Sequence, residues 1–62
     1  MPIDDRELWA CALTVERRYG DRAPVHVAER IGALVLDGDH DGVKVWKAIA
    51  VRLDQLRQQA PD

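Results

Sequence analysis

The sequence holds a single cysteine, Cys11, which excludes a disulfide within the chain. A lone cysteine is typical of a reducing compartment, so we expect a cytoplasmic protein. The segment Met1–Glu7 is acidic where a secretory signal would be basic, and we expect no targeting signal. The longest uninterrupted apolar run, Leu8–Leu13, is far shorter than the roughly 20 residues that span a membrane. We therefore predict no membrane segment.

The chain also lacks an excess of basic residues. It has nine Lys and Arg against eleven Asp and Glu, a net charge of -2 and a pI near 5.5. Binding to a phosphate backbone normally requires a basic excess, so a strongly basic nucleic-acid module is excluded. With 62 residues, 47% hydrophobic and 32% charged, the chain is too short for a multidomain enzyme. These values predict one small folded domain over residues 1–62.

Residues for catalysis and metal binding are scarce. There is no serine or asparagine, and a domain of this size has little room for a substrate pocket of several hundred Å3. Cys11, His26 and His40 lie in different segments without a paired ligand spacing, and His26 falls on a polar face that we expect to be solvated. We predict a protein that is not an enzyme and needs no cofactor or metal.

One segment matches the opening of a calcium-binding loop. Asp37–Gly42 reads D-x-D-x-D-G, which would place carboxylates at loop positions 1, 3 and 5. Position 12 of such a loop needs a bidentate acid, and here it is Ala48. We interpret the segment instead as a helix stop at Gly38 followed by a helix cap at Asp39.

Apolar residues recur at helical spacing in three segments. Asp4 with Glu7 resembles a capping box, Pro24 suits a first helical turn, and Gly38 with Asp39 marks the end of one helix and the start of the next. The predicted helices cover residues 5–19, 23–36 and 40–59.

Short connections between three amphipathic helices predict an all-α fold, either a three-helix bundle or a related tri-helical domain. Periodicity does not distinguish these two, because it carries no crossing angle. The residues expected in the core are Leu8, Ala12, Val15, Val27, Ile31, Leu34, Val35, Trp46, Ile49, Leu53 and Leu56.

The apolar stripes are wider than one small bundle requires. One interpretation is that each helix contacts both others, which widens its buried arc. The other is a surface that meets a second copy of the chain or another protein, and Gly32, one turn after Ala28, would let a helix approach closely there. The candidate interface residues are Trp9, Leu13, Val25, Gly32 and Leu36. We predict a non-enzymatic interaction module, with a homodimer as one form of it.

The alternative function is a small helix-turn-helix-like DNA-binding protein. Lys44, Lys47 and Gln55 fall on the outer side of the third predicted helix, as in a recognition helix. The net negative charge weighs against this hypothesis.

Four short motifs together resemble a known family. They are E-L-W-A-C-A at Glu7–Ala12, A-E-R-I-G-x-L at Ala28–Leu34, G-D at Gly38–Asp39, and W-K-x-I-A-x-R-L at Trp46–Leu53. Taken together they resemble a family of short bacterial proteins of unknown function, and the likeness extends over nearly the whole chain. The resemblance implies a small, stand-alone bacterial protein. It implies no catalytic or binding residues, because the family has no assigned activity.

Overall fold

The computed structural model describes residues 4–59, and all its regular structure is helical. The elements are α1 (Asp5–Tyr19), a 3-10 turn η1 (Gly20–Arg22), α2 (Ala23–Asp37) and α3 (His40–Gln59). The all-α prediction is confirmed for these residues, and the predicted helix ranges differ from the observed ones only in that α2 ends one residue later. The outermost residues of the predicted 1–62 domain, 1–3 and 60–62, lie outside the described residues.

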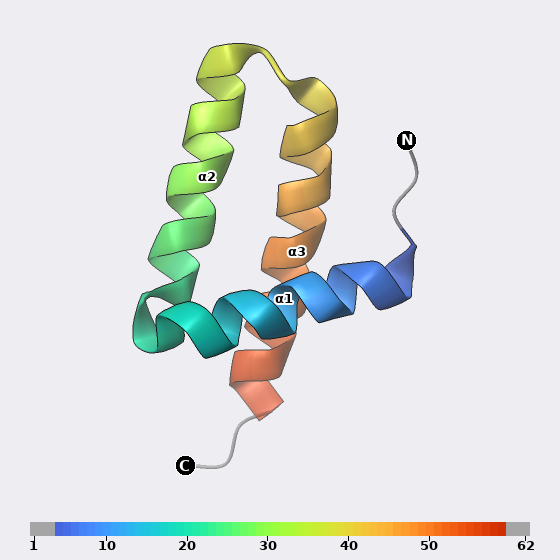
Figure 1. The fold of residues 1–62 in the computed structure, drawn as a ribbon, viewed down its shortest axis with the longest axis vertical. Helices are drawn as coiled ribbons and strands as arrows, with labels where there is room; N and C mark the ends of the chain where they lie inside the picture. Colours follow the sequence, from blue (N-terminus) through green and yellow to red (C-terminus); the bar gives the residue numbers. More distant parts are fainter. Residues whose placement is uncertain (1–3, 60–62) are drawn as a thin grey trace.

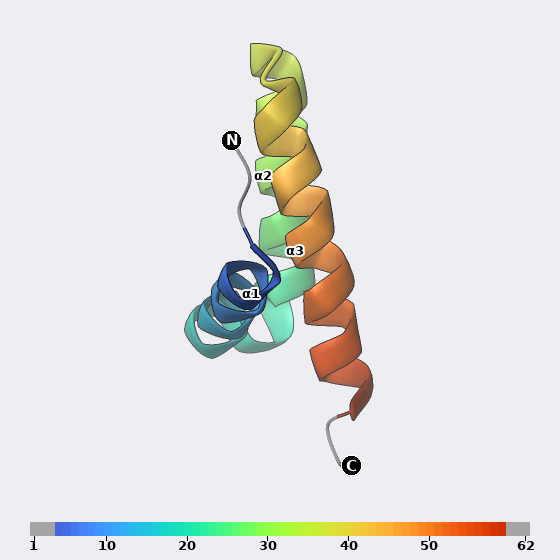
Figure 2. The ribbon, with the colours of Figure 1, turned by 90° about the vertical axis from the view of Figure 1, so that its right-hand side faces the viewer.

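Of the two predicted arrangements, a three-helix bundle or a related tri-helical domain, the bundle is not observed. α2 and α3 run side by side as an antiparallel hairpin, whereas α1 lies across one end of it (Figure 1). Seen from the side, α1 is viewed nearly along its axis while the hairpin remains upright (Figure 2). The change of direction occurs at Gly20, whose φ of 54° and ψ of -124° few other residues adopt. The periodicity of α1 carries no information about this crossing.

Local capping explains where the helices begin and end. Asp4 Oδ1 accepts a hydrogen bond from the Glu7 amide at 2.9 Å, and the Asp4 amide donates to Glu7 Oε1 at 3.5 Å, which confirms the predicted capping box. Gly38, with a φ of 74°, ends α2 in the left-handed conformation. Asp39 Oδ1 then accepts from the Gly42 amide at 2.9 Å and starts α3.

The core lies where α1 crosses the hairpin. Its buried members are Leu8, Ala12, Val15, Ala23, Val27, Ile49 and Leu53. Among the residues predicted for the core, Ile31, Trp46 and Leu56 are half-buried, and Leu34 is buried outside this cluster. Val35 was predicted wrongly: its exposed fraction is 59%, because no element of the described chain covers that side of α2.

Two arginines of α3 hold α1 against the hairpin. Arg52 donates from Nε to Asp5 Oδ1 at 3.0 Å and also from Nη2. Arg57 donates to Glu16 at 3.0 Å and to the carbonyl oxygen of Gly20 at 3.1 Å. The second pair ties the end of α1 to the last turns of α3.

Within residues 4–59, no helix combines the length and apolar character that crossing a membrane requires.

Candidate interaction surface

One side of α2 is apolar along the whole helix, and the part of the chain that the structure describes leaves it uncovered. We call it the α2 outer face. Successive residues turn by about 100° around a helix, so its members share an arc of about 140°. They are Pro24, Val25, Ala28, Ile31, Gly32, Val35 and Leu36. All are exposed except Ile31, which is half-buried at the edge beside α3.

The exposure of the largest side chains on this face is high. Val25 is 46% exposed, Val35 59% and Leu36 89%. The charged residues of α2 are Glu29, Arg30 and Asp37, and all of them lie outside the arc. Single apolar residues at a surface are ordinary, but a continuous uncharged face along a helix is typical of a contact surface.

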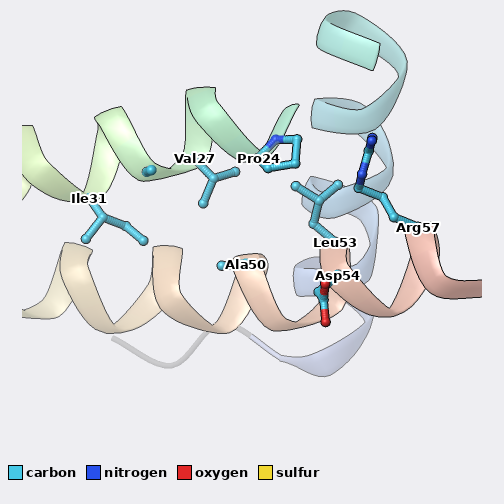
Figure 3. A pocket seen from close by; sticks show the side chains of 8 residues that line it. Pro24, Val27, Ile31, Ala50, Leu53, Asp54 and Arg57 are labelled. Carbon is cyan, nitrogen blue, oxygen red and sulfur yellow. The ribbon is translucent and has the colours of Figure 1, made fainter. Parts of the chain in front are cut away.

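The α2 outer face continues into a groove of about 270 Å3 between α2 and α3 (Figure 3). Its wall on α2 consists of Pro24, Val27 and Ile31, and its wall on α3 consists of Ala50 and Leu53. One end of the groove is lined by Asp54 and Arg57 (Figure 3). None of its lining residues belongs to α1. The groove therefore opens on the part of the hairpin that α1 leaves uncovered.

The two charged residues at the end of the groove already have partners. Arg57 is bonded to Glu16 and to the Gly20 carbonyl oxygen, and Asp54 Oδ2 accepts from the Gln58 side chain at 2.8 Å. An apolar helix that entered the groove would therefore leave neither charge without a partner.

Gly32 lies in the middle of the α2 outer face. A Cβ atom built on it would meet nothing within 4 Å, and its φ is not positive. Neither backbone conformation nor packing among residues 4–59 therefore explains a glycine at this position. In a helix interior, glycine costs about 1 kcal/mol relative to alanine.

The predicted interface residues fall on two different helices. Val25, Gly32 and Leu36 are on the α2 outer face, but Trp9 and Leu13 are on α1. Leu13 is 40% exposed. Trp9 is half-buried, with the Arg52 guanidinium 5.9 Å from its ring centroid. Neither α1 residue lines the groove. The assignment of all five to an interface stays a prediction.

The residues of the DNA-binding hypothesis, Lys44, Lys47 and Gln55, are exposed on α3. They share that side of α3 with Val51, which is 55% exposed. In a helix-turn-helix the two helices meet at about 90–120° across a turn of three to four residues. Here α2 and α3 are antiparallel neighbours joined by Gly38 and Asp39, so the arrangement differs from that motif (Figure 1).

A second hollow, of about 360 Å3, lies where α1 meets the hairpin, and Cys11, Thr14 and Arg18 are among its lining residues. Tyr19 and His26 stack at its wall with ring centroids 4.0 Å apart, and His26 meets Trp46 edge-on at 6.0 Å.

This aromatic stack joins all three helices. Sequence reasoning placed His26 on a solvated face, whereas the ring is half-buried between Tyr19 and Trp46. No periodic signal could reveal the contact, because it depends on how η1 turns the chain. The stacked rings explain how α1 is held in place, and aromatic pairs of this kind contribute about 0.5–1.5 kcal/mol each.

The acidic segment between α2 and α3 is used for capping. Asp39, the middle carboxylate of the D-x-D-x-D-G sequence, accepts the Gly42 amide. A Cβ on Gly42 would lie 2.6 Å from Asp39 Oδ2, so this glycine makes room for the cap. Within residues 4–59, no group of three or more His, Cys, Asp or Glu side chains is placed to hold a metal ion.

The fold and this surface define a small all-α domain with an uncovered apolar helix. The chain belongs to a family of unknown function (DUF6961), which it matches over residues 4–61. No curated protein and no solved structure matches the chain. The expectation of a family of short, uncharacterised proteins is thus confirmed, while the four motifs quoted for it stay untested.

Proposed function

We propose that this protein is a non-enzymatic interaction module that binds another polypeptide through the α2 outer face. The observation that carries the proposal is the uncharged, exposed arc from Pro24 to Leu36, which continues into the groove beside α3. Its side chains are aliphatic or absent, so it offers no acid, base or nucleophile. What such a face can do is contact another apolar surface.

The energy available at this face is substantial for so small a domain. Complete burial of a Val or Leu side chain is worth about 1.5–3 kcal/mol. Leu36 is 89% exposed and Val35 is 59% exposed, so folding of their own chain releases only part of this burial energy. Their burial by a partner would therefore add binding energy without disturbing the core.

The test is to place charges on the face and to compare binding. In the double variant Val35→Lys with Leu36→Lys, both substitutions are at exposed sites, so helix content measured by circular dichroism should be unchanged. The matched control is Val51→Lys, which makes the same exchange at a 55% exposed valine on α3.

Wild type, double variant and control are immobilised and exposed to extract of the source cell, to which a differently tagged second copy of the chain is added. We expect wild type and control to retain the same proteins, and the double variant to bind them at least about tenfold more weakly, since 1.4 kcal/mol corresponds to a factor of ten. Equal retention by all three would contradict the proposal.

A further inference from the structure

We infer that the partner is a second copy of this chain, docked by antiparallel pairing of the two α2 helices across a two-fold axis between Ala28 and Gly32. This inference rests on the proposed function, because it names the occupant of the α2 outer face. In such a pair the same surface is used twice, so the surface must be complementary to itself.

The first argument is Gly32. Glycine is a poorer helix former than alanine, so its presence inside α2 needs a reason. Apart from the adjoining residues and backbone of α2 itself, no atom of residues 4–59 lies within 4 Å of the position of its missing Cβ. A glycine allows another backbone to approach closely, and Ala28, one turn earlier, is also small. We call Ala28 and Gly32 together the small-residue step. A second helix crossing at this step would supply the close approach that the isolated chain lacks.

The second argument is the order of large and small residues along α2. Antiparallel pairing about this step sets Ala28 opposite the partner's Gly32. It also sets Val25 opposite the partner's Val35, and Pro24 opposite the partner's Leu36. Small residues then meet at the crossing and bulky ones meet on either side of it, as close packing of two helices requires.

The third argument is charge. Arg22 immediately precedes α2 and Asp37 ends it, and both are exposed. Antiparallel pairing brings Arg22 near the partner's Asp37, and it also sets the two helix dipoles in opposite directions. Parallel pairing would instead bring like charges together at each end. The charges thus favour the antiparallel arrangement.

The α2 outer face is long enough for a second helix to pair along it. α2 has 15 residues and is about 22 Å long, and the members of the face, from Pro24 to Leu36, extend over most of that length.

The decisive variant is Gly32→Arg. Arginine is a better helix former than glycine, and its Cβ would have no side chain of residues 4–59 within 4 Å, so the monomer should be at least as stable as wild type. At the proposed crossing, the same side chain would separate the two helices. The matched control is Ala33→Arg, which adds the same side chain at an exposed position about 100° away, outside the α2 outer face.

Sedimentation equilibrium in reductant, over a wide concentration range, reads out the mass. The 7.0 kDa chain should form a dimer of about 14 kDa as wild type and as Ala33→Arg, and should remain a monomer as Gly32→Arg. Thermal unfolding at a dilution at which wild type is also monomeric checks that Gly32→Arg is folded. A wild-type chain that stays monomeric, or a dimer that survives Gly32→Arg, would overturn the inference.

These outcomes are separable from failure of the proposed function. A monomeric wild type that still retains proteins in a Val35- and Leu36-dependent way would overturn the second copy as partner but leave the interaction face intact. A wild type that is monomeric and also retains no protein through Val35 and Leu36 would contradict the proposed interaction face itself.

Pairing direction is tested by cross-linking. In a Cys11→Ala background, chains carrying Ala28→Cys are mixed with chains carrying Gly32→Cys and oxidised. A disulfide needs Cα atoms about 4.4–6.8 Å apart, so antiparallel pairing predicts the 28–32 bridge as the main product. A majority of 28–28 and 32–32 bridges would contradict it.

Discussion

The two sides of the α2–α3 hairpin carry similar aliphatic residues in opposite environments. On the side crossed by α1, Ile49 is 2% exposed and packs in the core with Ala12, which is fully buried. On the other side, Val35 is 59% exposed and Leu36 89%. The comparison teaches that apolar content alone does not decide burial here; the position of α1 does. One side is the core, and the other is available to a partner.

The largest effect expected from this comparison is at the covered side. Ile49→Ala should destabilise the domain by about 2–5 kcal/mol, because it leaves a cavity in the core. A domain of this size has only about 3–5 kcal/mol of stability in total, so much of the protein should be unfolded at 25 °C. Val35→Ala should change the stability of the dilute monomer by less than about 0.5 kcal/mol. Urea unfolding measures both; similar losses would contradict the comparison.

A smaller effect is expected from loosening α1. Arg57→Ala removes the ion pair with Glu16 and the hydrogen bond to the Gly20 carbonyl oxygen. Both charged side chains are about one-third exposed, so we expect a loss of about 1 kcal/mol that shrinks at high salt. Urea unfolding at low and high salt measures it. Arg57→Lys, which keeps the charge but loses the planar guanidinium, should recover part of the loss.

The smallest effect has the opposite sign. Gly32→Ala should stabilise the dilute monomer by about 0.5–1 kcal/mol, because alanine restricts the unfolded chain and meets no atom within 4 Å. Thermal unfolding of wild type and variant at low concentration measures the change. A destabilised monomer would mean that Gly32 is needed within its own chain, and would remove the first argument for a close approach by a second copy.

Much of the helical fold could be predicted because the signals that start and end these helices are local. Asp4 with Glu7, and Gly38 with Asp39, make their hydrogen bonds within a few residues along the chain. The arrangement of the helices could not be predicted in the same way, since the backbone at Gly20 decides where α1 lies. For this reason the three-helix bundle, one of the two predicted arrangements, is not observed, and the prediction that Val35 is buried was wrong.

The interaction surface was predictable in part. The wide apolar stripe on α2 is visible in the sequence, but which part of it α1 covers is not. Ala23, fully buried, was not predicted for the core because a small side chain adds little to a hydrophobic stripe. Gly32 drew attention in the sequence as a helix glycine, but only the structure shows that no neighbour within the chain requires it.

The central claim is the proposal that a second copy of the chain covers the α2 outer face. The most direct measurement is the methyl NMR spectrum of the labelled protein at low and high concentration. The account predicts that the methyl signals of Val25, Val35 and Leu36 shift with concentration, while those of Ile49 and Val51 stay in place. Signals that move on Leu13 and not on α2, or that do not move at all up to millimolar concentration, would contradict it.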